Sequence, residues 1–327
     1  MFTIFFDKNY WRLKKVFFTK SLKYSFIYDL VETLYYLFNK NVSNYLIFSG
    51  PQKLINYLLR IYKGNNNVTF NDYKKSNSYI VQFDSFGQSV LEKLVNKKRI
   101  NSKILIGPLF NLNQLDILIK KMQENENIFM HVVSDSSKKL VLKYNSNIDK
   151  DRIVTIPIGV ISENETISKA KRRHPPTKCL IYFKKRSDKE LNYVINCLNE
   201  FNIETSIFKY GDYKNSQLLK AAVENDFGII IDKTESQGFA IQELMSKNLP
   251  LFVWDYTEND WFGKKFKGTT VPYWSDECGI KFYKQEELKE SLNLFLMNIN
   301  KFTPKKFVIQ NLSYENTVDK FSKFFNH

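Results

Sequence analysis

The segment DFGIIIDKTESQGFAIQELMSKNLPLFVWD, residues 226–255, decides the fold. It starts with a short apolar run, passes through a polar turn at 233–237 and takes a helical pattern from Gly238 to Asn248. Pro250 then prevents further helix, because proline lacks a backbone donor and restricts the residue before it. The apolar run LFVW follows. A strand, a turn, a helix and a second strand in this order form a βαβ unit of a parallel sheet.

The same alternation extends along the chain in both directions. We expect strands at 2–6, 45–48, 79–83, 104–106, 129–133, 153–156, 180–183, 205–208, 227–231 and 251–254. We expect helices at 22–38, 53–62, 89–96, 136–144, 189–201, 216–224, 239–247, 286–298 and 314–325. The polar, basic stretch 162–178, with two adjacent prolines, is typical of a linker. We therefore predict two α/β domains, 1–165 and 166–302, and a C-terminal helix at 303–327 that packs back on the first domain.

Length and charge narrow the functional classes. A chain of 327 residues exceeds what one hydrophobic core usually supports, so two domains are expected. The net charge of +15 suits nucleic acid, an anionic membrane surface or phosphorylated substrates, and it equally fits solvated lysines spread over the surface. The alternative from a different class is a basic α/β protein that binds nucleic acid or another polyanion without catalysis. The lysines are scattered, however, and no known nucleic-acid-binding module is visible.

The cysteines and the apolar runs indicate the compartment. Cys179, Cys197 and Cys278 are few and widely spaced, which argues against a disulfide framework or a zinc site. No signal peptide or membrane-spanning run is visible, so we expect a cytoplasmic protein. Residues 11–26 mix bulky aromatics with lysines, which allows either a packed helix or peripheral contact with an anionic membrane.

The turn and helix start ESQGFAIQE, residues 235–243, have the chemistry of a ligand site. The backbone N–H groups of Gly238, Phe239 and Ala240 lie at the positive end of the helix dipole, where a phosphate binds well. Glu235 and Glu243 are carboxylates that accept hydrogen bonds from hydroxyls. The spacing alone also fits two ordinary acids, one complementing the helix dipole and one solvated.

The segment TESQGFAIQELMSKNLPLFVWD, residues 234–255, resembles the donor-binding motif of GT-B glycosyltransferases, especially the retaining nucleotide-sugar enzymes of glycosyltransferase family four. Their pattern is Glu, seven residues, Glu, with a glycine in the turn, and then a helix, a proline and a strand. IVTIPIGV at 153–160 and HVVSDSSKKLV at 131–141 resemble the family's elements at the end of the first domain. The resemblance implies two Rossmann-like α/β domains that face each other across a cleft.

The resemblance also implies residue roles in the second domain. Glu235 would contact hydroxyls of the transferred sugar, and Glu243 would bind the ribose of the nucleotide. The backbone of 238–240 would hold the diphosphate, and Ser236 and Gln237 belong to the same donor-binding turn. No metal or other cofactor is expected.

Two further segments supply donor-site candidates. YFKKRSDKE at 182–190 places Lys184, Lys185 and Arg186 after a strand, where family members use a basic pair. These cations would stabilise the leaving diphosphate, unless they are simply a solvated strand end. FKYGDY at 208–213 places Tyr210 and Gly211 where the nucleotide base is expected, and an ordinary turn with a packed tyrosine is the alternative.

The family mechanism is transfer with retention of anomeric configuration, in which a donor phosphate oxygen takes the acceptor's proton. A double displacement through Glu235 is the less favoured route. We expect a UDP- or GDP-sugar as donor and a glycan, glycoprotein or glycolipid as acceptor. Many relatives carry a histidine where this chain has Gly107-Pro108, and His131 has the sequence context of a strand residue. Asp84, Ser85 and Phe86, at a strand end, are the acceptor-side candidates.

Other enzyme classes lack their motifs. A GT-A enzyme needs a metal-binding Asp-x-Asp at a strand end, and the one match, Asp149-Lys150-Asp151, precedes a strand and fits capping acids better. A dinucleotide oxidoreductase needs GxGxxG after its first strand, and a serine hydrolase needs GxSxG. Neither motif occurs.

Overall fold

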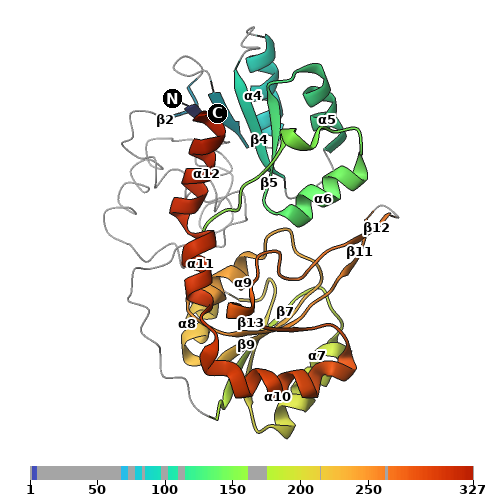
Figure 1. Cartoon of the computed structure of the whole chain (residues 1–327), viewed down its shortest axis with the longest axis vertical. Helices are drawn as coiled ribbons and strands as arrows, with labels where there is room; N and C mark the ends of the chain where they lie inside the picture. The colour runs from blue at the N-terminus through green and yellow to red at the C-terminus, as the bar shows by residue number, and fades with distance from the viewer. Residues whose placement is uncertain are drawn as a thin grey trace, which may run out of the picture.

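The computed structural model describes residues 2–5, 68–72, 78–82, 85–96, 102–109, 115–160, 175–213, 215–261 and 264–326. The expected strand at 45–48, the expected helices at 22–38 and 53–62, the membrane-contact candidate 11–26 and most of the predicted linker lie outside these ranges. The described residues form two parallel sheets, each covered by helices (Figure 1). No helix within the described ranges has both the length and the apolar character needed to span a bilayer.

The first sheet has six strands in the order β2-β1-β3-β4-β5-β6, all parallel. They are β1 (Phe2–Phe5), β2 (Val68–Phe70), β3 (Ser78–Val81), β4 (Lys103–Leu109), β5 (Ile128–Val132) and β6 (Ile153–Thr155). Its helices are α4 (Ser85–Asn96), α5 (Leu115–Glu124) and α6 (Asp135–Tyr144). Their buried side chains form one core with strand residues such as Phe5 and Tyr79.

The opposite face of the first sheet packs against α12 (Tyr314–Asn326). Phe321 is fully buried there, and its ring meets His131 edge-on with 5.4 Å between centroids. Phe325 stacks on Phe2 at 5.1 Å. Figure 1 shows this helix running beside the first strands of the chain. The end of the described chain therefore completes the core around its beginning.

The second sheet has five parallel strands in the order β13-β10-β9-β7-β8. They are β7 (Lys178–Phe183), β8 (Glu204–Lys209), β9 (Phe227–Ile231), β10 (Leu251–Trp254) and β13 (Gly279–Phe282). The central strand β9 is buried at every position, as expected for a parallel strand covered on both faces.

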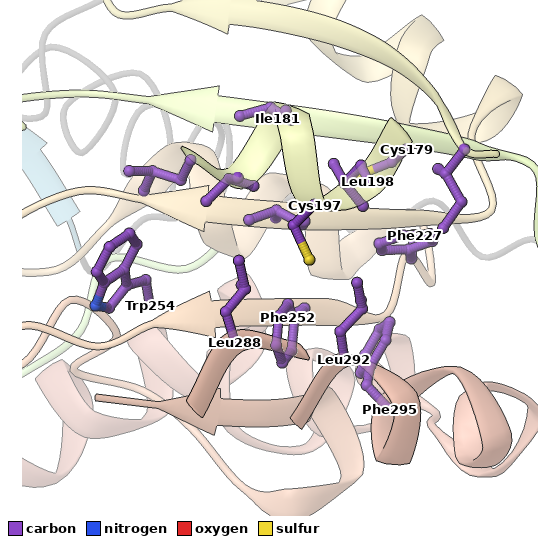
Figure 2. Close-up of a cluster of buried hydrophobic side chains, with 14 of the residues drawn as sticks. Cys179, Ile181, Cys197, Leu198, Phe227, Phe252, Trp254, Leu288, Leu292 and Phe295 are labelled. Atoms are coloured by element: carbon purple, nitrogen blue, oxygen red, sulfur yellow. The ribbon is translucent and has the colours of Figure 1, made fainter. Parts of the chain in front are cut away.

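Helices cover both faces of this second sheet. One face packs against α7 (Asp188–Glu200) and α10 (Leu288–Asn298), with Phe252, Leu288 and Phe295 in the shared core shown in Figure 2. The other face packs against α8 (Asn215–Glu224), α9 (Phe239–Ser246) and α11 (Pro304–Leu312). These layers hold the carboxyl ends of the strands in fixed positions.

Two structural features join the two sheets. A hairpin of β11 (Glu258–Trp261) and β12 (Lys264–Lys267), which the sequence did not predict, extends towards α6 (Figure 1), and the Lys143 ammonium donates to the carbonyl of Lys265. The segment 157–160 is held against the helices α11 and α12 as well. The backbone N–H of Gly159 donates to Thr317 Oγ1 at 2.8 Å, and a side chain at 159 would lie 2.5 Å from the carbonyl oxygen of Ser313. Glycine is therefore required for this close approach.

Candidate functional site

The candidate site lies where four neighbouring strands of the second sheet end. Parallel strands present their carboxyl ends at one edge, which is where α/β sheets bind ligands. Lys184 follows β7, Tyr210 follows β8, Asp232 follows β9 and Asp255 follows β10. Four polar or ionisable side chains thus meet at one edge of the sheet.

Glu235 is the centre of an ion cluster at this edge. Its Oε1 accepts hydrogen bonds from the Lys184 ammonium and, at 3.0 Å, from the Lys185 ammonium. Backbone hydrogen bonds hold Lys184 and Glu235 in place. Lys184 N donates to the Ile231 carbonyl at 2.9 Å, and Glu235 N donates to the Thr269 carbonyl at 3.0 Å. The Lys184 and Glu235 side chains are 11% and 12% exposed, whereas Lys185 is 50% exposed. Lys185 is therefore the cation of the pair that a ligand meets first.

The charges in this cluster stabilise one another. Burial alone would raise the pKa of Glu235, but the ammonium groups of Lys184 and Lys185 hold it below its ordinary value. Burial would lower the pKa of Lys185, and the charge and hydrogen bond of Glu235 raise it instead. Glu235 is consequently an ionised acceptor, and Lys185 is a cation, at neutral pH.

Asp232 belongs to the cluster and is absent from the sequence-based candidates. It is fully buried, and its Oδ2 lies 3.9 Å from Lys184 Nζ. The signal that would have found it is its position as the first residue after the buried run FGIII, at the carboxyl end of the central strand. Its carboxyl makes the site a set of two acids and two lysines.

Arg186 does not join this cluster. Its guanidinium binds Glu190 at 2.6 Å and lies over the Trp254 ring, 4.1 Å from the centroid. Glu190 also accepts from Ser187, which caps the start of α7. The structure thus distinguishes the three consecutive cations: two reach Glu235, and Arg186 fastens α7 to β10.

Gln237, a predicted donor-binding residue, makes two of its side-chain hydrogen bonds to Ile158, in the first half of the chain. Its side chain is 1% exposed, accepts from Ile158 N at 3.1 Å and donates to Ile158 O at 2.6 Å. A third hydrogen bond, of 3.0 Å, reaches the Gln242 side chain. Ser236, the preceding residue, is half-buried. The role of Gln237 in the structure is therefore to hold the turn before α9 against 157–160.

The helix α9 starts as the sequence predicts. Gly238 has φ 76° and ψ 57°, a left-handed conformation that favours glycine, and it caps the helix without a side-chain hydrogen bond. The first-turn N–H groups of a helix have no partner within the helix. Phe239 packs in the cores of both sheets, and Ala240 follows it, half-buried.

Glu243 and the loop after β8 flank the cluster. Glu243 is 8% exposed, and Asn215 Nδ2 lies 3.5 Å from its Oε1. Tyr210 is 63% exposed, and the Lys184 ammonium lies 4.4 Å from its ring centroid. Gly211 follows with φ 95°, and a Cβ built there would meet no heavy atom within 4 Å. The structure thus brings Glu235, Glu243 and Tyr210 to one edge of the sheet.

The remaining candidates lie elsewhere. Asp84 is outside the described residues, and Ser85 and Phe86 begin α4 after β3. Asp149 Oδ1 accepts from Asp151 N at 2.9 Å, which is the geometry of a capping acid. Within the described ranges, no group of three or more His, Cys, Asp or Glu side chains is arranged to hold a metal ion.

Comparison with known proteins identifies the fold. No family model and no curated protein matches the chain. The solved structure of WaaB, a lipopolysaccharide outer core galactosyltransferase in its apo form, superposes with a TM-score of 0.51 at 13% identity, covering 83% of this chain and 80% of WaaB. The chain has the GT-B fold. The predicted fold class is confirmed, while membership of family four, the domain boundaries and the residue roles stay predictions.

Two larger proteins of known structure are also similar. Staphylococcus aureus TarM, solved with UDP, matches with a TM-score of 0.49 at 13% identity over 84% of this chain, and pneumococcal GtfA, solved with UDP and GlcNAc, matches with 0.49 at 12% over 86%. The chain spans 58% of the TarM chain and 61% of the GtfA chain.

Proposed function

We propose that this protein is a glycosyltransferase that moves a sugar from a UDP- or GDP-sugar to a hydroxyl of a glycan, glycoprotein or glycolipid. The observation that carries the proposal is the pairing of Glu235 with Lys184 and Lys185 beside the N-terminus of α9. WaaB, which shares the fold, is by its name a galactosyltransferase, and this agrees with the proposal.

Each part of a nucleotide sugar has a matching group at this edge. The first-turn N–H groups of α9 and the exposed ammonium of Lys185 suit the diphosphate. Glu243 suits the ribose hydroxyls, since a carboxylate accepts their hydrogen bonds. The exposed ring of Tyr210 offers a face on which a base stacks. Glu235 then lies nearest the sugar.

The proposed chemistry follows from these positions. As the glycosidic bond breaks, negative charge develops on the nucleoside diphosphate, and Lys184 and Lys185 stabilise it. The acceptor hydroxyl attacks the anomeric carbon on the face that the diphosphate leaves, and its proton passes to the departing phosphate oxygen. The configuration is retained, and no metal or protein base is required. Glu235, ionised and bound by two ammonium groups, orients sugar hydroxyls and is a weakened nucleophile, which disfavours double displacement.

A binding panel tests the proposal without a known acceptor. UDP, GDP and their sugars are added to the wild-type protein and to Glu235→Gln, and thermal stabilisation and donor hydrolysis are measured. We expect one nucleotide to stabilise the wild type and the variant to lose donor turnover by about 100-fold or more. Glu190→Gln is the matched control, because the cation that Glu190 binds, Arg186, lies outside the cluster.

The polyanion-binding alternative gives a different result. It predicts DNA or heparin retention that UDP and GDP do not displace, together with no turnover of any nucleotide sugar. Equal donor hydrolysis by the wild type and Glu235→Gln would also contradict the proposed role of this cluster.

A further inference from the structure

Asp232 and Asp255 occupy the same position at the ends of neighbouring strands, but their hydrogen bonding differs. The carboxylate of Asp255 accepts from Thr270 N at 2.7 Å and from Lys281 Nζ at 3.0 Å, so both of its oxygens are satisfied. Within the described ranges, Asp232 Oδ1 accepts a hydrogen bond only from the N–H of the next residue, at 2.7 Å. Its buried Oδ2 has no hydrogen-bond partner among the described residues. A buried oxygen left this way requires an explanation.

The neighbours of Asp232 supply that explanation. The charged groups that act on it are Glu235 and the ammonium groups of Lys184 and Lys185, and the phenols of Tyr182 and Tyr213 also lie near. Two buried carboxylates in one site repel each other, and neither has a proton to donate. A proton on one of them removes both problems. A protonated Asp232 donates a hydrogen bond to Glu235, which the two lysines keep ionised.

The surroundings of Asp232 disfavour its charge, which favours a shared proton on Asp232 over Glu235. Burial, and then the negative charge of Glu235, raise the pKa of Asp232 to about 8, against the opposing effect of Lys184. At neutral pH the two lysines contribute two positive charges and Glu235 one negative charge, which leaves one positive charge. Ionisation of Asp232 releases its proton to solvent and reduces this charge to zero.

We propose that Asp232 is a positioning residue that sets the charge offered to the donor's diphosphate. Protonated, it holds Glu235 through a hydrogen bond and leaves Lys184 for the ligand; ionised, it draws Lys184, already 3.9 Å away, to itself. This inference rests on the proposed function for the identity of the ligand. It predicts that the affinity for a nucleoside diphosphate falls as the pH rises through about 8.

Calorimetric titration with UDP and GDP from pH 7 to 9.5 tests the inference. The second ionisation of the phosphates has a pKa of about 6, so it is mostly complete at pH 7, and its remainder would strengthen binding rather than weaken it. We expect the dissociation constant of the wild type to rise on the order of tenfold across this range. Asp232→Asn keeps the shape and the hydrogen bond but cannot ionise, so its affinity stays near the neutral-pH value throughout. A pH step of the same size in Asp232→Asn would overturn the inference.

Asp226→Asn is the matched control. Asp226 is also a buried aspartate next to β9, but it lies at the opposite end of the strand, where it accepts from Thr177 N and Lys178 N at 2.9 and 3.0 Å. This variant should keep the wild-type pH step. If Asp226→Asn also lost the pH-dependent change in affinity, then neutralising an unrelated buried aspartate would abolish it equally well. That result would overturn a specific role for Asp232.

A measurement without nucleotide separates this inference from the proposed function. Because the folded pKa of Asp232 lies above the unfolded value of about 4, the folded state holds an extra proton between these values. The free energy of unfolding therefore contains a contribution that is present at low pH and is lost as the pH rises towards 8. Asp232→Asn and Asp232→Ser should both lack it. If the wild type and the two variants show the same pH dependence of unfolding, the inference is overturned. If the pH dependence differs but neither UDP nor GDP binds at any pH, the diphosphate role and the proposed function are overturned.

Discussion

The side-chain amide of Gln237 pairs with both backbone groups of Ile158, 79 residues earlier in the chain. The N–H of Ile158 donates to the amide oxygen, and the amide nitrogen donates to the carbonyl of Ile158. On the other side of this segment, Thr317 accepts from Gly159 and donates to the carbonyl of Pro157 at 2.9 Å. These hydrogen bonds thus hold the turn before α9 in a fixed position relative to the first sheet and to α12.

Replacing Gln237 should weaken the fold as well as the site. Gln237→Leu leaves the buried N–H and C=O of Ile158 without partners, and we expect it to lower the free energy of unfolding by about 2–4 kcal/mol. The affinity for UDP or GDP should fall too, because the start of α9 loses its support. Urea unfolding and calorimetry measure the two effects. Gln310→Leu, on the exposed side of α11, should change neither, and a stable Gln237→Leu would contradict the role assigned to this amide.

The adjacent cations Lys185 and Arg186 should separate binding from stability. Lys185→Ala removes an exposed ammonium, so UDP or GDP binding should weaken by about 10- to 100-fold with little change in unfolding. Arg186→Ala removes the contacts to Glu190 and Trp254, so it should cost about 1–3 kcal/mol of stability and leave the intrinsic affinity unchanged. The reverse pattern in the two variants would show that the arginine serves the ligand.

Glu243→Gln should raise the KM for the nucleotide sugar. A carboxylate accepts two hydroxyls more strongly than an amide does, and we expect about a tenfold increase with a smaller change in kcat. Initial rates of donor hydrolysis at several donor concentrations provide the measurement. Glu224→Gln, on the exposed side of α8 and paired with Lys220, is the control. An effect on kcat alone would place Glu243 nearer the reacting bond than proposed.

His131 should make the protein acid-sensitive. Its Nε2 donates to the Ile156 carbonyl at 2.7 Å, and burial lowers its pKa to about 4, against the opposing effect of that hydrogen bond. The unfolded chain binds a proton at about pH 6.5, so the free energy of unfolding decreases as the pH falls from 6.5 towards 4, by about 3 kcal/mol in total. Denaturant unfolding of wild type and His131→Gln at pH 7, 5.5 and 4.5 isolates the effect. Parallel pH curves for the two proteins would contradict it.

Much of the second sheet could be predicted from the sequence. Its central strands read as unbroken apolar runs between turn residues, and the observed β9 and β10 have the predicted bounds. The limits of α9 could also be predicted, because Gly238 precedes the helix and Pro250 follows it. The resemblance to the GT-B donor-binding motif made Lys184, Lys185 and Glu235 candidates, and the structure brings these three side chains together.

Other features depend on contacts that a local pattern does not contain. Gln237 has the sequence context of a ligand-binding turn, but its partner lies in the other half of the chain. Arg186 differs from its lysine neighbours because the chain turns after β7 at Lys185, whose φ is 56°, and because Glu190 is one helical turn away. The hairpin of β11 and β12 has no alternation of apolar and polar residues, so periodicity did not reveal it.

The helix α12 has a consequence for synthesis on the ribosome. Phe2 and Ile4 are translated long before Phe321 and Phe325, which complete their buried face and emerge some three hundred residues later. Until then the nascent first sheet exposes an apolar surface, of the kind that chaperones bind and that aggregates in their absence. The second sheet contains its own cores, so the part of the chain made later is expected to reach its native packing before the part made first.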